Sequence, residues 1–118
     1  MIRRLDAIAN EMKVLIASFG HAGDGNIHVS LATADQSTPP EHLIRAREAV
    51  LKAAIALEGR IAAEHGIGML KRNKIGWNLD EATLSLMHRV KRLMDPNGIL
   101  NPGKIFPSSC SCAIENRT

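Results

Sequence analysis

The chain has 118 residues, enough for one ordinary domain and too few for two. Hydrophobic residues make up 45% of it and aromatic residues only 3%, so its core has to be aliphatic. Fifteen basic against twelve acidic residues give a net charge of +3, without the clustered basic and aromatic residues of a nucleic-acid-binding surface. No apolar run approaches the ~20 residues that span a bilayer, and the N-terminus does not resemble a secretory signal. We therefore expect a cytoplasmic protein that binds no nucleic acid and has no transmembrane segment.

The first part of the chain predicts a helix followed by a β-hairpin. Apolar residues recur at helical spacing over residues 2–12 and predict a short amphipathic helix. Residues 14–19 are a compact apolar run typical of a buried strand, and residues 27–32 alternate as a half-buried strand does. With Asp24-Gly25 at the centre of the connecting turn, His21 is expected directly opposite His28.

A second helix and a short strand are predicted after a polar loop. Ser37 or Thr38 can cap this helix, and an apolar stripe runs along residues 43–57. Gly59 is expected to end the helix, because glycine is favoured just beyond a helix C-terminus. Residues 59–63 are then expected to form a short strand.

A third helix precedes the end of the chain. Asn78 begins a sequence similar to a capping box, and apolar spacing continues the helix over residues 79–94. Residues 95–98 predict a turn, and residues 99–107 are expected to run extended.

The order helix, strand, strand, helix, short strand, helix predicts an α+β fold with helices packed on an antiparallel sheet. It is similar to a ferredoxin-like unit that lacks its first strand. We expect residues 1–107 to form one domain and residues 108–118 to form a disordered tail. A missing strand leaves an open sheet edge, which favours self-association.

The histidines beside the predicted turn carry the clearest chemical signal. Directly opposed residues of a hairpin have Cβ atoms ~5 Å apart, which lets two imidazoles bind one divalent ion. Glu64 can supply a third ligand while its neighbour His65 faces a substrate. A set of two histidines and one carboxylate suits zinc, manganese or ferrous iron.

Plainer interpretations stay open on spacing alone. A cross-strand histidine pair is more often an ordinary sheet pair than a metal site, and a lone loop carboxylate is usually solvated. The three glycines at 20, 23 and 25 are a weak phosphate-binding signal, because neither a helix nor a Lys-Ser/Thr pair follows directly. The basic residues Lys71, Arg72 and Lys74 are typical of a solvated turn.

Three segments together resemble the C-terminal domain of FAD-linked oxidases. They are Phe-Gly-His-Ala-Gly-Asp-Gly-Asn-Ile-His at 19–28, Glu-His-Gly-Ile-Gly at 64–68 with Lys71-Arg72, and Asp-Pro-Asn-Gly-Ile-Leu-Asn-Pro-Gly-Lys-Ile-Phe at 95–106. That family includes glycolate oxidase flavin subunits, D-lactate dehydrogenases and D-2-hydroxyglutarate dehydrogenases. The resemblance runs from about residue 2 to residue 107.

The resemblance implies that the chain is the substrate- and metal-binding cap portion of a flavin-dependent 2-hydroxyacid dehydrogenase or oxidase of the glycolate or D-lactate type. It implies that His21, His28 and Glu64 bind a divalent metal in the members that have one. The metal would stabilise alkoxide charge that develops on the substrate.

The resemblance also implies roles for residues around the substrate and the flavin. Asn26 and His65 would contact a small 2-hydroxyacid, with His65 as the catalytic base that takes the hydroxyl proton. Asn101 and Lys104 would lie near the flavin as cofactor-binding residues.

In the family, FAD is held by a separate domain, whose glycine-rich flavin-binding region is absent from this sequence. We therefore expect an FAD-binding domain or subunit to be a partner, and the isolated chain to be inactive and to bind no FAD. Two alternatives are a non-enzymatic metal-binding or interaction module and one subunit of a split flavoprotein.

Overall fold

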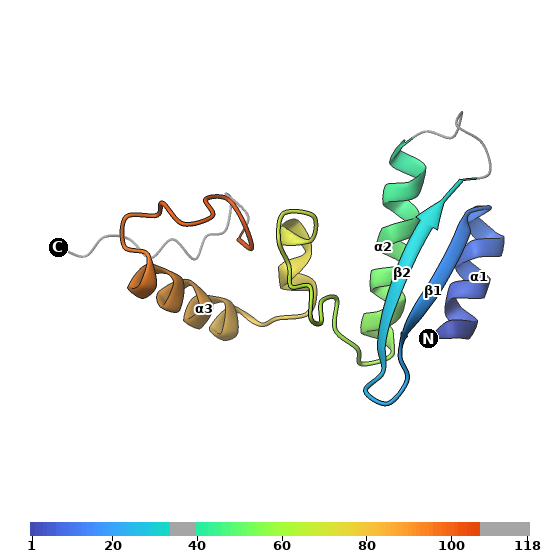
Figure 1. Cartoon of the computed structure of the whole chain (residues 1–118), viewed down its shortest axis with the longest axis horizontal. Helices are drawn as coiled ribbons and strands as arrows, with labels where there is room; N and C mark the ends of the chain where they lie inside the picture. The colour runs from blue at the N-terminus through green and yellow to red at the C-terminus, as the bar shows by residue number, and fades with distance from the viewer. Residues whose placement is uncertain (34–39, 107–118) are drawn as a thin grey trace. The chain divides into compact units, whose positions relative to one another are not determined.

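A computed structural model describes residues 1–33 and 40–106 (Figure 1). The chain divides into two compact units, Met1–Arg60 and Ile61–Thr118. The elements in order are α1 (Ile2–Met12), β1 (Leu15–His21), β2 (Asn26–Ala32), α2 (Pro40–Ala56), the 3-10 helix η1 (Arg72–Trp77) and α3 (Glu81–Met94).

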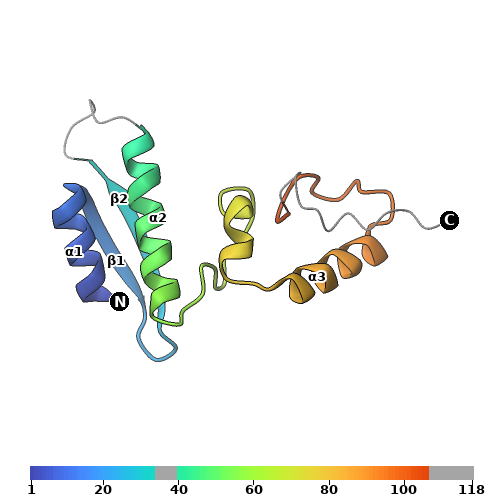
Figure 2. The same cartoon turned by 180° about the vertical axis from the view of Figure 1, so that it is seen from behind.

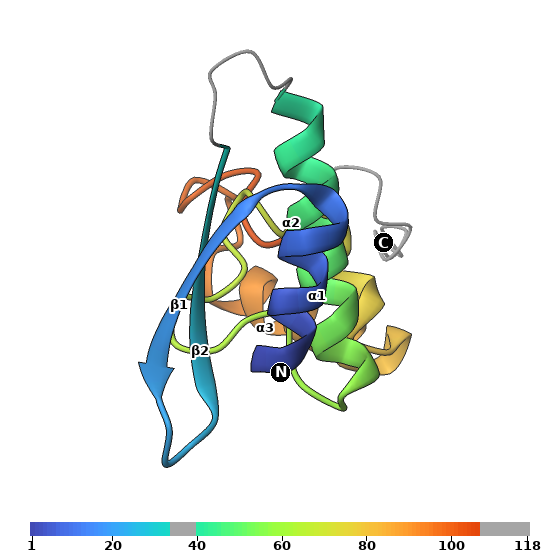
Figure 3. The same ribbon diagram turned by 90° about the vertical axis from the view of Figure 1, so that its right-hand side faces the viewer.

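In the first unit, α1 and α2 cover one face of the β1–β2 hairpin (Figures 2 and 3). The β2 residues Ile27, Val29 and Leu31 are partly buried, whereas Ser30 and Ala32 between and after them are exposed. From Val29 to Ala32 this is the period-two pattern of a strand with one covered face, whereas Asn26 and His28 on the other face are also partly buried. The buried apolar side chains of the unit are Leu5, Val14, Ala46 and Val50. The predicted α+β class, with helices on an antiparallel sheet, is confirmed.

The sheet has two antiparallel strands among the residues that the structure describes. Helix, strand, strand, helix in this order is consistent with part of a ferredoxin-like unit. No helix in the described ranges has the length and apolar character to cross a membrane.

The ends of α1 and α2 depend on left-handed residues that are not glycine. Lys13 follows α1 with a φ of 51°, and His42 of α2 places its Nε2 2.5 Å from the carbonyl oxygen of Met12, at the α1 C-terminus. Beyond α2 the left-handed residue is Glu58, with a φ of 60°. The Gly59 amide donates to the Ala54 carbonyl at 2.9 Å, and a Cβ at Gly59 would lie 2.9 Å from the same oxygen. Glycine is therefore favoured at this position by the close contact of the two backbone segments and not by a positive φ. The predicted caps at Ser37 and Thr38 lie outside the described residues.

The second unit departs from prediction at its first element. Residues 59–63 were expected to form a short strand, but no strand occurs there. The Ile61 amide instead donates to the Asn78 side chain at 3.3 Å, and Ile61, Ile75 and Leu84 are the buried apolar residues of this unit. An amide that bonds a side chain in this way is satisfied without sheet pairing.

The cap of α3 also differs from the predicted Asn78. Asp80 is the N-cap, and its Oδ1 accepts a hydrogen bond from the Thr83 amide at 2.7 Å. This bond favours the carboxylate form and lowers the pKa of Asp80. Asn78 is occupied by the bond to Ile61, so the next residue with a suitable side chain begins the helix.

The segment after α3 is held by a buried carboxylate. Asp95 accepts hydrogen bonds from the amides of Ile99 and Leu100, both at 3.0 Å, and from the Lys91 ammonium. Residues 99–106 were expected to be extended but are turned, with the Lys104 amide donating to Asn101 at 3.3 Å. The predicted tail at 108–118 lies outside the described residues.

Candidate metal and substrate site

The register of the hairpin differs by two residues from the predicted one. His28 lies opposite Phe19, and His21 lies opposite Asn26, so the two histidines are diagonal rather than directly opposed. Side chains alternate between faces with a period of two, and a shift of two residues therefore keeps both histidines on the same face. The prediction of direct pairing is wrong, and the prediction of a shared face is right.

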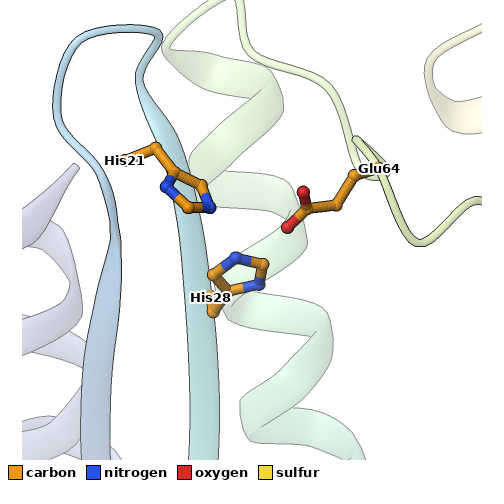
Figure 4. Close-up of side chains that lie close together, drawn as sticks. All are labelled: His21, His28 and Glu64. Atoms are coloured by element: carbon orange, nitrogen blue, oxygen red, sulfur yellow. The ribbon is translucent and has the colours of Figure 1, made fainter.

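The two imidazoles meet on this face despite their diagonal relation (Figure 4). Their ring centroids are 5.7 Å apart and their planes are inclined by 82°. With metal–nitrogen bonds of about 2.0–2.1 Å, two imidazoles on one tetrahedral ion have centroids roughly 5 Å apart. The observed separation of the His21 and His28 rings therefore fits two ligands of one ion after a small adjustment.

A third ring belongs to this face. Phe19 stacks on His28 with ring centroids 5.1 Å apart and planes inclined by 29°. Phe19 is 67% exposed, so its ring lies on the open side of the hairpin together with His28. Sequence reasoning missed Phe19 because the expected register put His21, not Phe19, opposite His28.

The turn between the strands is built by its polar and glycine residues. The Asp24 carboxylate accepts from the Asn26 amide at 3.2 Å, and Gly25 has a φ of 72°. This places Asn26 at the first position of β2, opposite His21 and on the histidine face. Gly20 is required at its site, because a Cβ there would lie 2.0 Å from the Asn26 carbonyl oxygen.

In the second unit, Glu64 and His65 occupy a tight turn. The Gly66 amide donates to the Ala63 carbonyl at 3.3 Å and closes the turn around them. The Glu64 Oε1 lies 3.5 Å from the His65 Nε2. The side chains of His65 and Glu64 are 72% and 49% exposed, so both are accessible to a ligand.

Asn101 and Lys104, the expected cofactor-binding residues, contact each other. The Lys104 ammonium donates to the Asn101 side-chain oxygen at 3.2 Å, and Asn101 has a φ of 49°. A lysine and an amide side by side offer donors to an anionic or carbonyl group. Their role toward a flavin stays a prediction.

The comparison with known families decides the identity of this domain. The family described as FAD linked oxidases, C-terminal domain, matches residues 1–105. The chain belongs to this family.

This FAD-linked oxidase C-terminal domain is similar to several longer proteins. It is 37% identical over 110 residues to a D-2-hydroxyglutarate dehydrogenase of Stutzerimonas stutzeri, a match that covers 89% of the chain and 24% of that protein. It is 39% identical over 106 residues to a mitochondrial D-2-hydroxyglutarate dehydrogenase of Arabidopsis thaliana, covering 90% of the chain and 18% of the relative. It is 36% identical over 107 residues to the glycolate oxidase subunit GlcD of Bacillus subtilis, covering 90% and 23%.

The FAD-linked oxidase C-terminal domain thus spans between 18% and 24% of the length of these three relatives. The family expected from the three sequence segments is confirmed. The activity, the substrate and the partners of a complete protein are matters for proposal.

Proposed function

We propose that this chain is the substrate- and metal-binding cap portion of a flavin-dependent 2-hydroxyacid dehydrogenase or oxidase, of the glycolate or D-lactate type. The observation that carries the proposal is the imidazole pair of His21 and His28 on the outer face of the hairpin. The family match supports the reaction class, since the relatives include D-2-hydroxyglutarate dehydrogenases and a glycolate oxidase subunit.

A divalent ion of the zinc, manganese or ferrous type is proposed to bind His21 and His28, with Glu64 as the carboxylate ligand. The imidazole pair of the first unit supports two of these ligands, and the exposed carboxylate of Glu64 in the second unit is the proposed third. Two imidazoles and one carboxylate leave coordination positions for substrate oxygens. When bound, the ion would act as a Lewis acid toward the hydroxyl and carboxylate of the hydroxyacid.

His65 is proposed to accept the substrate hydroxyl proton. Its imidazole is exposed and near the Glu64 carboxylate, which can orient the ring through one oxygen while the other remains for the ion. Neutral imidazole is a suitable general base near physiological pH. Asn26 offers amide donors on the histidine face and is proposed to bind the substrate carboxylate.

FAD, held by a part of the protein outside this chain, would supply the acceptor for the hydride that leaves the substrate carbon. Asn101 and Lys104 are proposed to face that flavin. Lys104 keeps its ammonium exposed while it bonds to Asn101, so it remains available to a flavin carbonyl or phosphate.

The outer surface of α3 is proposed to pack against the flavin-binding part. The support is an apolar stripe at helical spacing whose members are all more than half exposed: Leu86, Val90, Leu93 and Met94. The same stripe would serve if the flavin-binding part were a separate subunit, and without that part it favours self-association of the chain.

Metal titration of the chelator-treated chain tests the proposal. Calorimetry with Zn²⁺ and Mn²⁺ should give one site per chain, and His28→Ala should weaken it by more than the roughly 10–100-fold typical of losing an outer-shell partner. His42→Gln is the matched control, because glutamine can still donate to Met12 and the hairpin is untouched. D-lactate or glycolate should strengthen metal binding to the wild type.

The same titration separates the alternatives. Equal affinity in the wild type and His28→Ala would contradict the metal centre. Metal binding that no hydroxyacid changes would favour a non-enzymatic metal-binding module. Co-purification with a separate flavoprotein chain would support the split-subunit alternative.

A further inference from the structure

The segment Asn101–Phe106, here called the C-terminal strap, is bound to the loop that follows His65. The Ile105 amide donates to the Gly68 carbonyl at 2.9 Å. The Arg72 guanidinium donates to the Gly103 carbonyl at 2.7 Å. Both contacts lie within the second unit and join segments more than thirty residues apart in sequence.

The strap is also held at its near end. Leu100, the residue before it, donates its amide to the Asp95 carboxylate at 3.0 Å and accepts from the Lys91 ammonium at 2.6 Å. The C-terminus of α3 therefore fixes where the strap begins, and the bonds at Gly103 and Ile105 fix where it runs.

One residue of the strap, Ile105, has a strained backbone conformation. Ile105 has a φ of 68°, a left-handed conformation that is an outlier for a β-branched residue. Such a conformation persists where the surroundings over-determine it, and it is common at functional sites. In this conformation the Ile105 amide bonds Gly68.

The loop that the strap holds carries the proposed catalytic turn. Gly66 and Gly68 have φ values of 69° and 57°, and the Gly66 amide bonds the Ala63 carbonyl across the turn of Glu64 and His65. Two glycines close to this turn give its backbone more conformational freedom than other residues would. The Gly68 anchor lies two residues beyond that turn and removes part of this freedom.

We propose that Arg72 is a positioning residue, which holds the C-terminal strap on Gly68 and thereby orders the turn of Glu64 and His65. The roles of these two residues rest on the proposed function, whereas the ordering itself does not. Arg72 was expected to lie in a solvated basic turn, yet its guanidinium bonds the strap carbonyl directly. The bond is charge-assisted, and the fixed geometry of the guanidinium sets the direction of Gly103.

Amide hydrogen exchange on the full chain tests the proposal. Arg72→Ala is expected to speed exchange of the Gly66 and Ile105 amides about tenfold, while the amides of the β1–β2 hairpin exchange as in the wild type. Arg72→Lys keeps a charged donor and should recover part of the protection. Ile105→Gly keeps the amide, suits a positive φ and should leave Gly66 as protected as in the wild type.

The proposal would be overturned if, in Arg72→Ala, the exchange rate of the Gly66 amide increased no more than the rates of the hairpin amides. If Arg72→Ala does not fold, Arg72→Met, which keeps the aliphatic stem and removes the donor, decides: selective loss of Gly66 protection supports the proposal, and exchange equal to the wild type overturns it. Zn²⁺ affinity is measured in parallel. Faster Gly66 exchange with unchanged Zn²⁺ affinity would support the positioning role of Arg72 and contradict Glu64 as a metal ligand. The failure of one proposal can therefore be told apart from the failure of the other.

Discussion

Phe19 and His28 lie directly opposite each other on β1 and β2, and their rings stack with centroids 5.1 Å apart. The His28 imidazole therefore stacks on the phenyl ring and lies nearly perpendicular to the His21 imidazole. An aromatic pair of this kind contributes about 0.5–1.5 kcal/mol beyond its buried area. Phe19 thus orients a proposed metal ligand without binding the metal itself.

Phe19→Leu should weaken metal binding about threefold to tenfold, because the His28 ring loses the stack that orients it. The ring-current shift of the His28 carbon-bound protons in NMR spectra should also disappear. Phe19→Tyr keeps the ring and is the control. Unchanged His28 shifts in Phe19→Leu would show that the stack is not populated in solution.

Gly20→Ala should destabilise the hairpin by about 3 kcal/mol, at the upper end of the usual range for overpacking, because its Cβ would meet the Asn26 carbonyl oxygen at 2.0 Å. Gly23→Ala is the matched control, since a Cβ there meets nothing within 4 Å. Denaturant unfolding compares the two variants. Equal midpoints would contradict the close strand approach at Gly20.

Acid should loosen the second unit through His88. Its ring stacks on Phe106 with centroids 3.7 Å apart, its Nε2 is buried without a hydrogen-bond partner in the described residues, and burial lowers its pKa. The unfolded state, with a pKa near 6.5, then binds a proton more readily than the folded state. The contribution of His88 to stability is therefore complete above about pH 6.5 and is lost as the pH falls through the lower, folded-state pKa.

His88→Phe keeps a stacked ring and removes this titration, so its stability should vary less with pH just below 6.5. Unfolding followed at several pH values provides the measurement. A second loss at lower pH is expected in both proteins, because the hydrogen bond from Lys91 lowers the pKa of Asp95 below its usual value near 4. An identical pH slope in the wild type and the variant would contradict the role of His88.

The purified chain should self-associate through α3. Leu93 and Met94, the last two residues of α3, are 81% and 73% exposed. Replacing both with lysine should move the mass from light scattering toward the 12.8 kDa of one chain. Leu57→Lys, which changes an exposed leucine of the first unit, is the control. A wild type that is monomeric at high concentration would contradict this prediction.

The purified chain should also carry no flavin. The basis is the sequence, which has no glycine-rich flavin-binding region beside the family motifs. Absorbance near the flavin bands and a dehydrogenase assay with D-lactate or glycolate provide the measurements. A stable yellow complex after addition of FAD and gel filtration would contradict the expectation.

Local sequence features determined the helices, the hairpin and the family. Apolar periodicity placed α1 at its observed bounds, Asp24-Gly25 marked the turn, and residues 19–28 and 64–68 carried the likeness to FAD-linked oxidases. These features are local because helix spacing and turn chemistry depend on residues within a few positions of one another.

Tertiary structure decided the strand register, the cap of α3 and the long-range hydrogen bonds. The hairpin register depends on how many residues form the turn, and the sequence did not determine that number. The period of two along a strand did determine that His21 and His28 share a face, because a shift by two residues leaves the faces unchanged. The cap at Asp80 depended on Ile61 occupying Asn78, seventeen residues away. The strap bond from Arg72 to Gly103 spans thirty-one residues. Ile105 takes a left-handed conformation that a β-branched residue disfavours, and its amide bonds the distant carbonyl of Gly68.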